Sequence, residues 1–132
     1  MTQPPFPAEI DAAQERVVTI CHQHYPGESV AKKVINLIEE AVELGMVIGV
    51  APEAMRRAMD LTIAKSDDPV GDPDATRKEV GDVVLSAFAV AGILGLSSRG
   101  ALAEVMAITE ARDPADSAAR SARKMAMGIT EG

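Results

Sequence analysis

Aromatic residues are nearly absent from this chain. They make up 2% of its 132 residues, and there is no tryptophan. Apolar residues still account for 47% of the sequence, and most of them are aliphatic. An aliphatic core favours helices packed on helices over a sandwich of aromatic-rich strands. Because no stretch of useful length alternates polar and apolar residues, we expect an all-α fold.

Three further shortages each exclude a class of protein. Basic residues are too few for a nucleic-acid polymer to bind, because the net charge is −7 and phosphate backbones require a basic surface. The single cysteine, Cys21, excludes an internal disulfide framework. No apolar run reaches the roughly 18 residues of a membrane span, and no basic segment followed by an apolar one indicates a signal peptide. We therefore expect a cytoplasmic protein without membrane contact.

Apolar periodicity, interrupted by prolines and glycines, divides the chain into helices. The expected helices cover residues 8–23, 29–49, 52–65, 73 or 75–95, 97 or 98–112, and 114 to just before 128. The whole chain, residues 1–132, is expected to form one domain. Residues 1–7, with three prolines, are expected to be flexible. The apolar run Val83–Leu96 is expected to form a buried helix.

Several residues have the chemistry of helix caps. Ser29 precedes one expected helix, and Asp113, followed by Pro114, precedes the last. Thr76 and Glu79, three residues apart, could form a capping box at the start of another.

The stretch Lys33–Gly49 combines an apolar stripe with three glutamates. Glu40 and Glu43 are three residues apart on the expected helix, and Glu39 lies four residues before Glu43. Like charges at these spacings weaken a helix by a few tenths of a kcal/mol per pair. A bound cation would reverse the sign of that effect.

A second acidic pair occurs in the stretch Lys78–Leu85. Glu79 and Asp82 are again three residues apart, beside an apolar stripe. Two such helices that face each other would place four carboxylates around one point. Oxygen ligands of this kind suit a hard cation in near-octahedral geometry. The alternative is that all four carboxylates lie on ordinary solvated helix faces.

The two stretches together resemble the MazG-type all-α nucleoside triphosphate pyrophosphohydrolases. The resemblance rests on INLIEEAVELG and KEVGDVVLSAF, which match the family pattern of E-x-x-E on one helix and E-x-x-D on the next. It covers roughly Ser29 to Leu96. It implies a four-helix-bundle-like fold with extra short helices, assembled as a homo-oligomer, either a dimer or a tetramer.

The resemblance also implies an activity. The expected reaction is hydrolysis of a (deoxy)nucleoside triphosphate to the monophosphate and pyrophosphate, a housecleaning of the nucleotide pool. It requires Mg²⁺, for which Mn²⁺ can substitute. The implied metal ligands are Glu40, Glu43, Glu79 and Asp82. Glu39 and Glu43 are the implied catalytic carboxylates, with Glu39 as general base or ligand of a second metal ion.

Other residues are candidates for substrate contacts. Basic side chains that could hold the phosphates are Lys78, Arg120, Arg123 and Lys124. The last three also have a purely structural explanation, because cations stabilise the C-terminus of a helix. His24 and Tyr25, expected in a loop before the first acidic helix, could contact a base or ribose.

Two alternatives remain open after the sequence analysis, and a third is rejected. The same fold could act on another pyrophosphate, such as phosphoribosyl-ATP. The chain could instead be a non-catalytic helical oligomerisation or binding module. A zinc site at Cys21, His22 and His24 is rejected, because the rest of the sequence holds no further Cys or His to complete a tetrahedral set.

Overall fold

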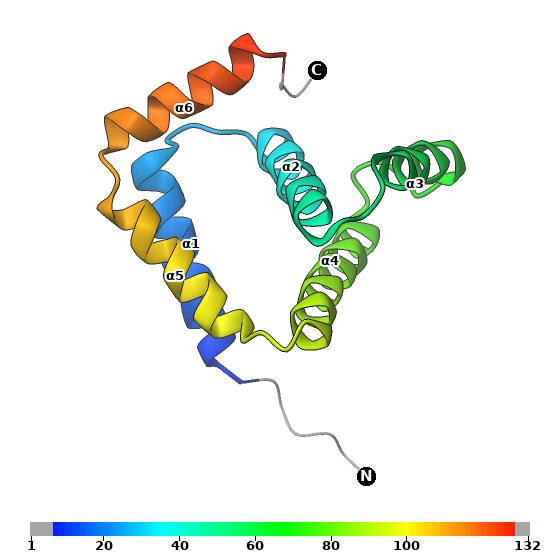
Figure 1. Cartoon of the computed structure of the whole chain (residues 1–132), viewed down its shortest axis with the longest axis horizontal. Coiled ribbons are helices and arrows are strands. Elements are labelled where there is room, and N and C mark those ends of the chain that lie inside the picture. Colours follow the sequence, from blue (N-terminus) through cyan, green and yellow to red (C-terminus); the bar gives the residue numbers. More distant parts are fainter. Residues whose placement is uncertain (1–6, 129–132) are drawn as a thin grey trace. The chain divides into compact units, whose positions relative to one another are not determined.

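The computed structural model describes residues 7–128 of the chain, and these residues form six helices and no strand (Figure 1). The helices are α1 (Glu9–His24), α2 (Val30–Ile48), α3 (Pro52–Lys65), α4 (Pro73–Ile93), α5 (Ser98–Ala111) and α6 (Pro114–Ala126). The expected all-α class is confirmed, and the helix boundaries agree with the sequence pattern to within about two residues. The expected flexibility of the N-terminal segment concerns residues that lie almost entirely outside the described range.

The ends of the helices follow from local chemistry. Ser29 accepts a hydrogen bond from the backbone N–H of Lys32 at 3.1 Å, and Asp113 accepts one from Ala115 at 2.8 Å. Both residues therefore cap their helices as the sequence predicts. At the other end of α2, Gly49 adopts a φ of 88°, and the N–H of Val50 donates to the carbonyl of Gly45 at 2.8 Å. This left-handed glycine ends the helix by satisfying its last carbonyls.

The capping box that Thr76 and Glu79 could have formed is not present. The N-cap of α4 is Asp72, whose carboxylate accepts a hydrogen bond from the N–H of Ala75 at 2.8 Å. Pro73 occupies the first helical position, where a missing N–H costs nothing. Thr76 already lies within the helix and donates its hydroxyl to the carbonyl of Asp72 at 2.8 Å. Glu79 is consequently not needed for capping.

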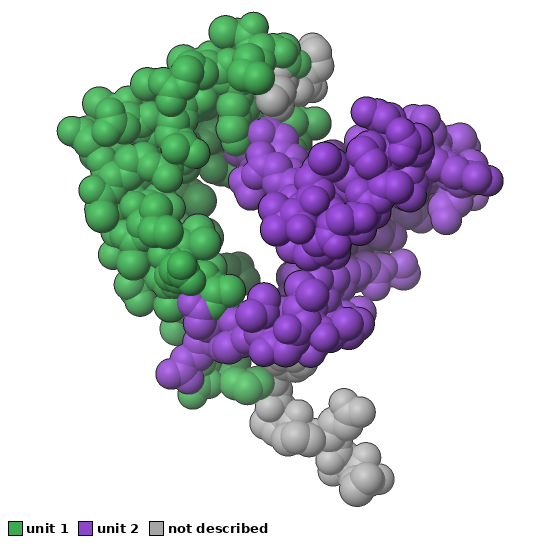
Figure 2. Space-filling model, in the orientation of Figure 1, with its two compact units in different colours: residues 1–35, 101–132 green, residues 36–100 purple. Residues whose placement is uncertain are grey.

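The chain divides into two compact units (Figure 2). Unit 1 combines the residues up to Ile35 with those from Ala101 onward, and unit 2 holds residues 36–100. Helix α2 begins in unit 1 and ends in unit 2. The single domain expected from chain length stays a prediction.

Unit 1 holds the two buried apolar side chains among the described residues, Ile20 of α1 and Met106 of α5. Helices α1 and α6 pack against each other. An ion pair between Arg16 of α1 and Glu110 of α5, at 3.2 Å, adds an exposed link. Exposed pairs of this kind contribute little stability, so the packing of α1 against α6 is the main tertiary contact seen in unit 1.

Unit 2 contains the main part of α2 together with α3 and α4. A close approach joins α2 to α3 at Gly45, where an added Cβ would lie only 2.5 Å from Sδ of Met55. A side chain at this position would require the Met55 side chain to move.

Helix α4 is not buried within a single chain. None of its residues falls in the buried class, and its apolar side chains are largely exposed. The expectation of a buried helix over Val83–Leu96 is therefore wrong for the single chain. Within the described part of the chain, no single helix is long and apolar enough to cross a membrane, and only the bent pair of α4 and α5 taken together meets that criterion.

Candidate metal and nucleotide site

Both carboxylates of the second acidic pair, on α4, contact the side chain of Lys78. The ammonium nitrogen of Lys78 lies 3.3 Å from Oε1 of Glu79 and 3.1 Å from Oδ2 of Asp82. Lys78 and Asp82 are one helical turn apart, and Glu79 is adjacent to Lys78. The two carboxylates therefore converge on one positively charged atom, as the three-residue spacing predicts.

The three charged side chains of this cluster, Lys78, Glu79 and Asp82, are all more than half exposed. The side chains of Lys78, Glu79 and Asp82 are 70%, 55% and 58% exposed, respectively. Hydrogen bonds from its ammonium to Asp82 and then to Glu79 raise the pKa of Lys78 above its ordinary value of 10.5. Lys78 therefore remains charged at neutral pH, and the group carries one net negative charge when both carboxylates are ionised.

The first acidic pair lies on α2, in the same unit. Glu40 and Glu43 are exposed, whereas Glu39 is half-buried. The structure thus separates the three glutamates by environment. Glu40 and Glu43 are open to solvent and to an approaching ion, and the surroundings of Glu39 differ from those of its neighbours.

The four predicted ligands are not gathered around one point in the single chain. Among residues 7–128, no group of three or more His, Cys, Asp or Glu side chains is placed to hold a metal ion. The pair on α4 converges on a cation, and the pair on α2 does not join it. Convergence of both pairs on one ion stays a prediction.

Comparison with known proteins does not show whether the two acidic pairs bind one metal ion. No protein-family model matches this chain, and no curated protein or solved structure is similar to it. The resemblance to MazG-type enzymes therefore rests on the two acidic motifs and on the helical order around them.

The donor set nevertheless fits a divalent hard cation in its chemistry. All four predicted ligands are carboxylates, and oxygen donors of this type are the ones that Mg²⁺ prefers. The observation that supports the fit is geometric: Glu79 and Asp82 already direct one oxygen each at the same cationic nitrogen. Binding of a metal ion by these carboxylates stays a prediction.

His24 has a partner inside the protein. It is the last residue of α1 rather than part of the loop where the sequence places it. Its exposed fraction is 4%, and Nδ1 lies 2.9 Å from the hydroxyl of Ser117 on α6, which is fully buried. The hydrogen bond joins α1 to α6. A contact between His24 and a nucleotide stays a prediction, and the structure gives this side chain a packing role.

Tyr25 is held by two cationic side chains. Its hydroxyl accepts a hydrogen bond from Nη1 of Arg112 at 3.2 Å. The ammonium of Lys33 lies 4.7 Å from the ring centroid, which is a cation–π contact. Lys33 also pairs with Glu28 at 3.1 Å. One face and the polar end of the tyrosine are therefore already in use, so a stacked base would have to approach the opposite face of the ring.

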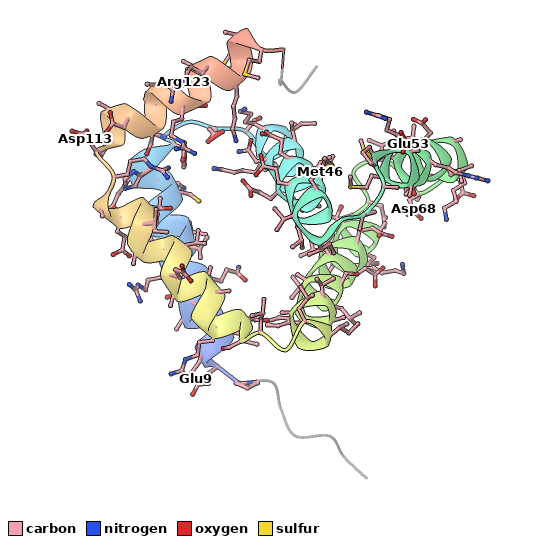
Figure 3. The ribbon with its side chains drawn as sticks, viewed as in Figure 1. Glu9, Met46, Glu53, Asp68, Asp113 and Arg123 are labelled. Carbon is pink, nitrogen blue, oxygen red and sulfur yellow. The ribbon has the colours of Figure 1, made fainter. Side chains whose placement is uncertain are left out.

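The basic residues of α6 differ in their exposure. Ser117, Ser121 and Lys124 are spaced four and three residues apart, and they form the less exposed face of the helix. Arg120 and Arg123 are exposed; Figure 3 labels Arg123 on α6 and Asp113 at its start. All three cations lie in unit 1. Their predicted contact with phosphates stays a prediction.

No pattern in the sequence selects Lys32, which the structure places in an unusual environment. This residue in the first turn of α2 is only 7% exposed, and its ammonium has no hydrogen-bond partner among the described residues. A charged group that is buried without a partner is costly. A burial pattern of this kind depends on tertiary packing, so the local sequence carries no signal for it.

Proposed function

We propose that this protein hydrolyses a (deoxy)nucleoside triphosphate to the monophosphate and pyrophosphate with the help of Mg²⁺. The observation that carries the proposal is that the carboxylates of Glu79 and Asp82 both contact the ammonium of Lys78. The resemblance of the two acidic motifs to MazG-type enzymes supplies the reaction. Mn²⁺ is the expected substitute for Mg²⁺.

Each carboxylate has a role in this proposal. Glu40 and Glu43 of α2, with Glu79 and Asp82 of α4, would hold the ion. When bound, the ion supplies positive charge that lets an anionic triphosphate approach the carboxylates and polarises the phosphorus. Glu39, which is half-buried beside the ligands, is the proposed general base that takes the proton of the attacking water.

The basic residues would neutralise the substrate further from the ion. Lys78 lies within the acidic pair of α4, and Arg120, Arg123 and Lys124 belong to α6. Arginine binds phosphate oxygens through two parallel N–H groups, whereas lysine acts as a point charge. His24 and Tyr25 remain the proposed contacts of the base or ribose.

The proposal is tested by pyrophosphate release from a panel of dNTPs and NTPs. With Mg²⁺ present, we expect release from at least one nucleotide, and we expect EDTA to abolish it. Glu43→Gln removes a ligand with almost no change of size and should reduce the rate by at least about 100-fold. Glu53→Gln is the matched control, because Glu53 lies on α3, is exposed and pairs only weakly with Arg56 at 3.9 Å.

Absence of release from every nucleotide, by folded protein, would contradict the proposal. The panel should include phosphoribosyl-ATP, because the same fold and metal site could act on that pyrophosphate.

The second candidate function is a non-catalytic helical oligomerisation module. The exposure of Glu40, Glu43, Glu79 and Asp82 favours it, because solvated carboxylates need no ligand. A folded oligomer that binds no divalent cation would support the module over the enzyme.

In either case we propose a homo-oligomer, a dimer or a tetramer. Val80, Val84 and Phe88 recur every four residues along α4, and all three are exposed. On a helix of 3.6 residues per turn they lie on the face opposite Glu79 and Asp82. A second chain could cover this apolar face and leave the acidic pair open.

A further inference from the structure

Lys32, in the first turn of α2, is a buried cation that the proposed reaction does not use. Its exposed fraction is 7%, and its ammonium has no hydrogen-bond partner among residues 7–128. We propose that Lys32 and the start of α2 bind a phosphate-type oxyanion. All the residues involved belong to unit 1, whereas both acidic pairs belong to unit 2, so this site is independent of the proposed metal site.

The position of Lys32 is unfavourable for a cation in the absence of a bound anion. A buried charge without a partner loses its hydration and gains nothing in return. The first turn of a helix also lies at the positive end of the helix dipole, which repels a further cation. No acidic residue in the first turn of α2 offsets these costs. An oxyanion would reverse both of them, because it would pair with the ammonium and would lie at the helix end that attracts negative charge.

The start of α2 offers backbone donors to the same anion. The first backbone hydrogen bond of the helix runs from the N–H of Lys33 to the carbonyl of Ser29 at 3.1 Å, and the N–H of Lys32 donates to the hydroxyl of Ser29 at 3.1 Å. The preceding N–H groups, those of Val30 and Ala31, have no acceptor within the helix. Val30 is 81% exposed, so an anion can approach these two groups from solvent.

Further positive charge lies beside the start of α2. Lys33 contacts the ring of Tyr25, and Arg112 donates a hydrogen bond to the hydroxyl of the same tyrosine. Glu28 pairs with Lys33 at 3.1 Å, so its carboxylate neutralises one of these cations. When Lys32 is included, three cations accompany one carboxylate. The balance of charge therefore favours an anionic ligand.

The side chain of Lys32 is long enough to meet an anion at the start of the helix. Side chains of a helix lean toward its start, and lysine carries its charge on a flexible four-carbon stem. The ammonium is covered in the anion-free chain, so we expect it to turn outward when an anion arrives. It then exchanges an unpaired position for a charge-assisted hydrogen bond, which is among the stronger contacts in proteins.

The test is calorimetric titration with inorganic phosphate in the presence of EDTA, so that no divalent ion takes part. Lys32→Met keeps an apolar side chain of similar length and removes the ammonium. We expect this variant to bind phosphate at least about tenfold more weakly than the unmodified chain, because it loses a charge-assisted hydrogen bond. Circular dichroism confirms that the variant is folded.

The matched control is Lys65→Met. Lys65 is an exposed residue at the end of α3, in unit 2, so the control makes the same substitution and removes the same charge away from the start of α2. We expect it to change the phosphate affinity less than about twofold, since a screened surface charge acts only weakly at a distance.

The midpoint of thermal unfolding gives a second readout. A ligand that binds only the folded chain stabilises it, so phosphate should raise the midpoint of the unmodified chain more than that of Lys32→Met. Phosphate also stabilises folded proteins in general, and Lys65→Met retains both that effect and the specific one. A rise that is equal in all three proteins would be the general effect alone and would count against the site.

A parallel titration with a nucleoside monophosphate distinguishes two sources of the oxyanion. Tighter binding of the nucleotide than of inorganic phosphate, lost in Lys32→Met, would identify the phosphate group of a nucleotide as the ligand. Equal binding of the two, again lost in Lys32→Met, would identify free phosphate.

Equal phosphate affinities of the unmodified chain and Lys32→Met would overturn the inference. Failure of the unmodified chain to bind either phosphate or the nucleotide would also overturn it. Neither result bears on Mg²⁺-dependent pyrophosphate release, which is proposed to depend on carboxylates of unit 2. Conversely, an absence of pyrophosphate release would refute the enzyme and leave phosphate binding at Lys32 to be decided by the titration.

Discussion

At the scale of the residue, two adjacent lysines show how strongly the environment decides what a charge contributes. Lys32 is buried, and its ammonium has no hydrogen-bond partner among the residues that the structure describes. Lys33 pairs with Glu28 and lies over the ring of Tyr25. The sequence treats the two as equivalent, since both are lysines in the first turn of one helix. Only the packing around them distinguishes a costly charge from a favourable one.

The two lysines lead to opposite predictions for stability. Lys32→Met keeps the aliphatic volume and removes a buried charge, so it should raise the free energy of unfolding by roughly 1 kcal/mol. Lys33→Met leaves the half-buried Glu28 without its cation and should lower that free energy by roughly 2 kcal/mol. Urea unfolding followed by circular dichroism measures both. A destabilised Lys32→Met variant would show that the ammonium has a stabilising partner.

At the scale of the element, the helices follow from short-range chemistry and the site does not. Pro52 and Pro114 start their helices as predicted, and Ser29 caps α2. These features depend on a few neighbouring residues, which a single sequence displays. The possible capping box does not form, because Asp72, four residues before Thr76, caps α4. The two acidic pairs were identified correctly as features of helix faces, but their mutual placement depends on packing that a sequence pattern does not contain.

The cap of α4 can be tested by substitution. Asp72→Ala removes the carboxylate that accepts the N–H of Ala75, and it should lower the free energy of unfolding by about 1 kcal/mol. Glu79→Gln should change it by less than about 0.5 kcal/mol, because Glu79 has no part in the cap. A thermal or urea melt of each variant makes the comparison. The reverse order of effects would restore the capping box predicted from the sequence.

At the scale of the whole molecule, the dominant feature is apolar surface that one chain leaves uncovered. The buried apolar residues of the described chain, Ile20 and Met106, both lie in unit 1. Helix α4 of unit 2 has none. Large apolar patches of this kind usually mark a contact with another protein. The apolar sequence of Val83–Leu96 predicts a buried helix. In the proposed homo-oligomer, a second copy of the chain would bury it.

The proposed homo-oligomer should be lost when its apolar contact face is disrupted. Phe88→Asp places a charge on the apolar face of α4 and should convert the assembly to a monomer, because a buried unpaired carboxylate is costly. Ala89→Asp adds the same charge one position further around the helix and should keep the assembly. Light scattering coupled to size-exclusion chromatography gives both masses. A monomeric mass for the unmodified chain would contradict the proposed assembly.

The central claim is that the acidic pairs of α2 and α4 bind the same divalent ion. The measurement that tests it most directly is Mn²⁺ titration of the unmodified chain, Glu43→Gln and Asp82→Asn, with Glu53→Gln of α3 as control. We predict that the first two substitutions each weaken binding by about tenfold or more, because each removes a ligand of one shared ion, and that the control binds normally. Unchanged affinity after either Glu43→Gln or Asp82→Asn would show that the two helices do not share an ion, and would contradict the account.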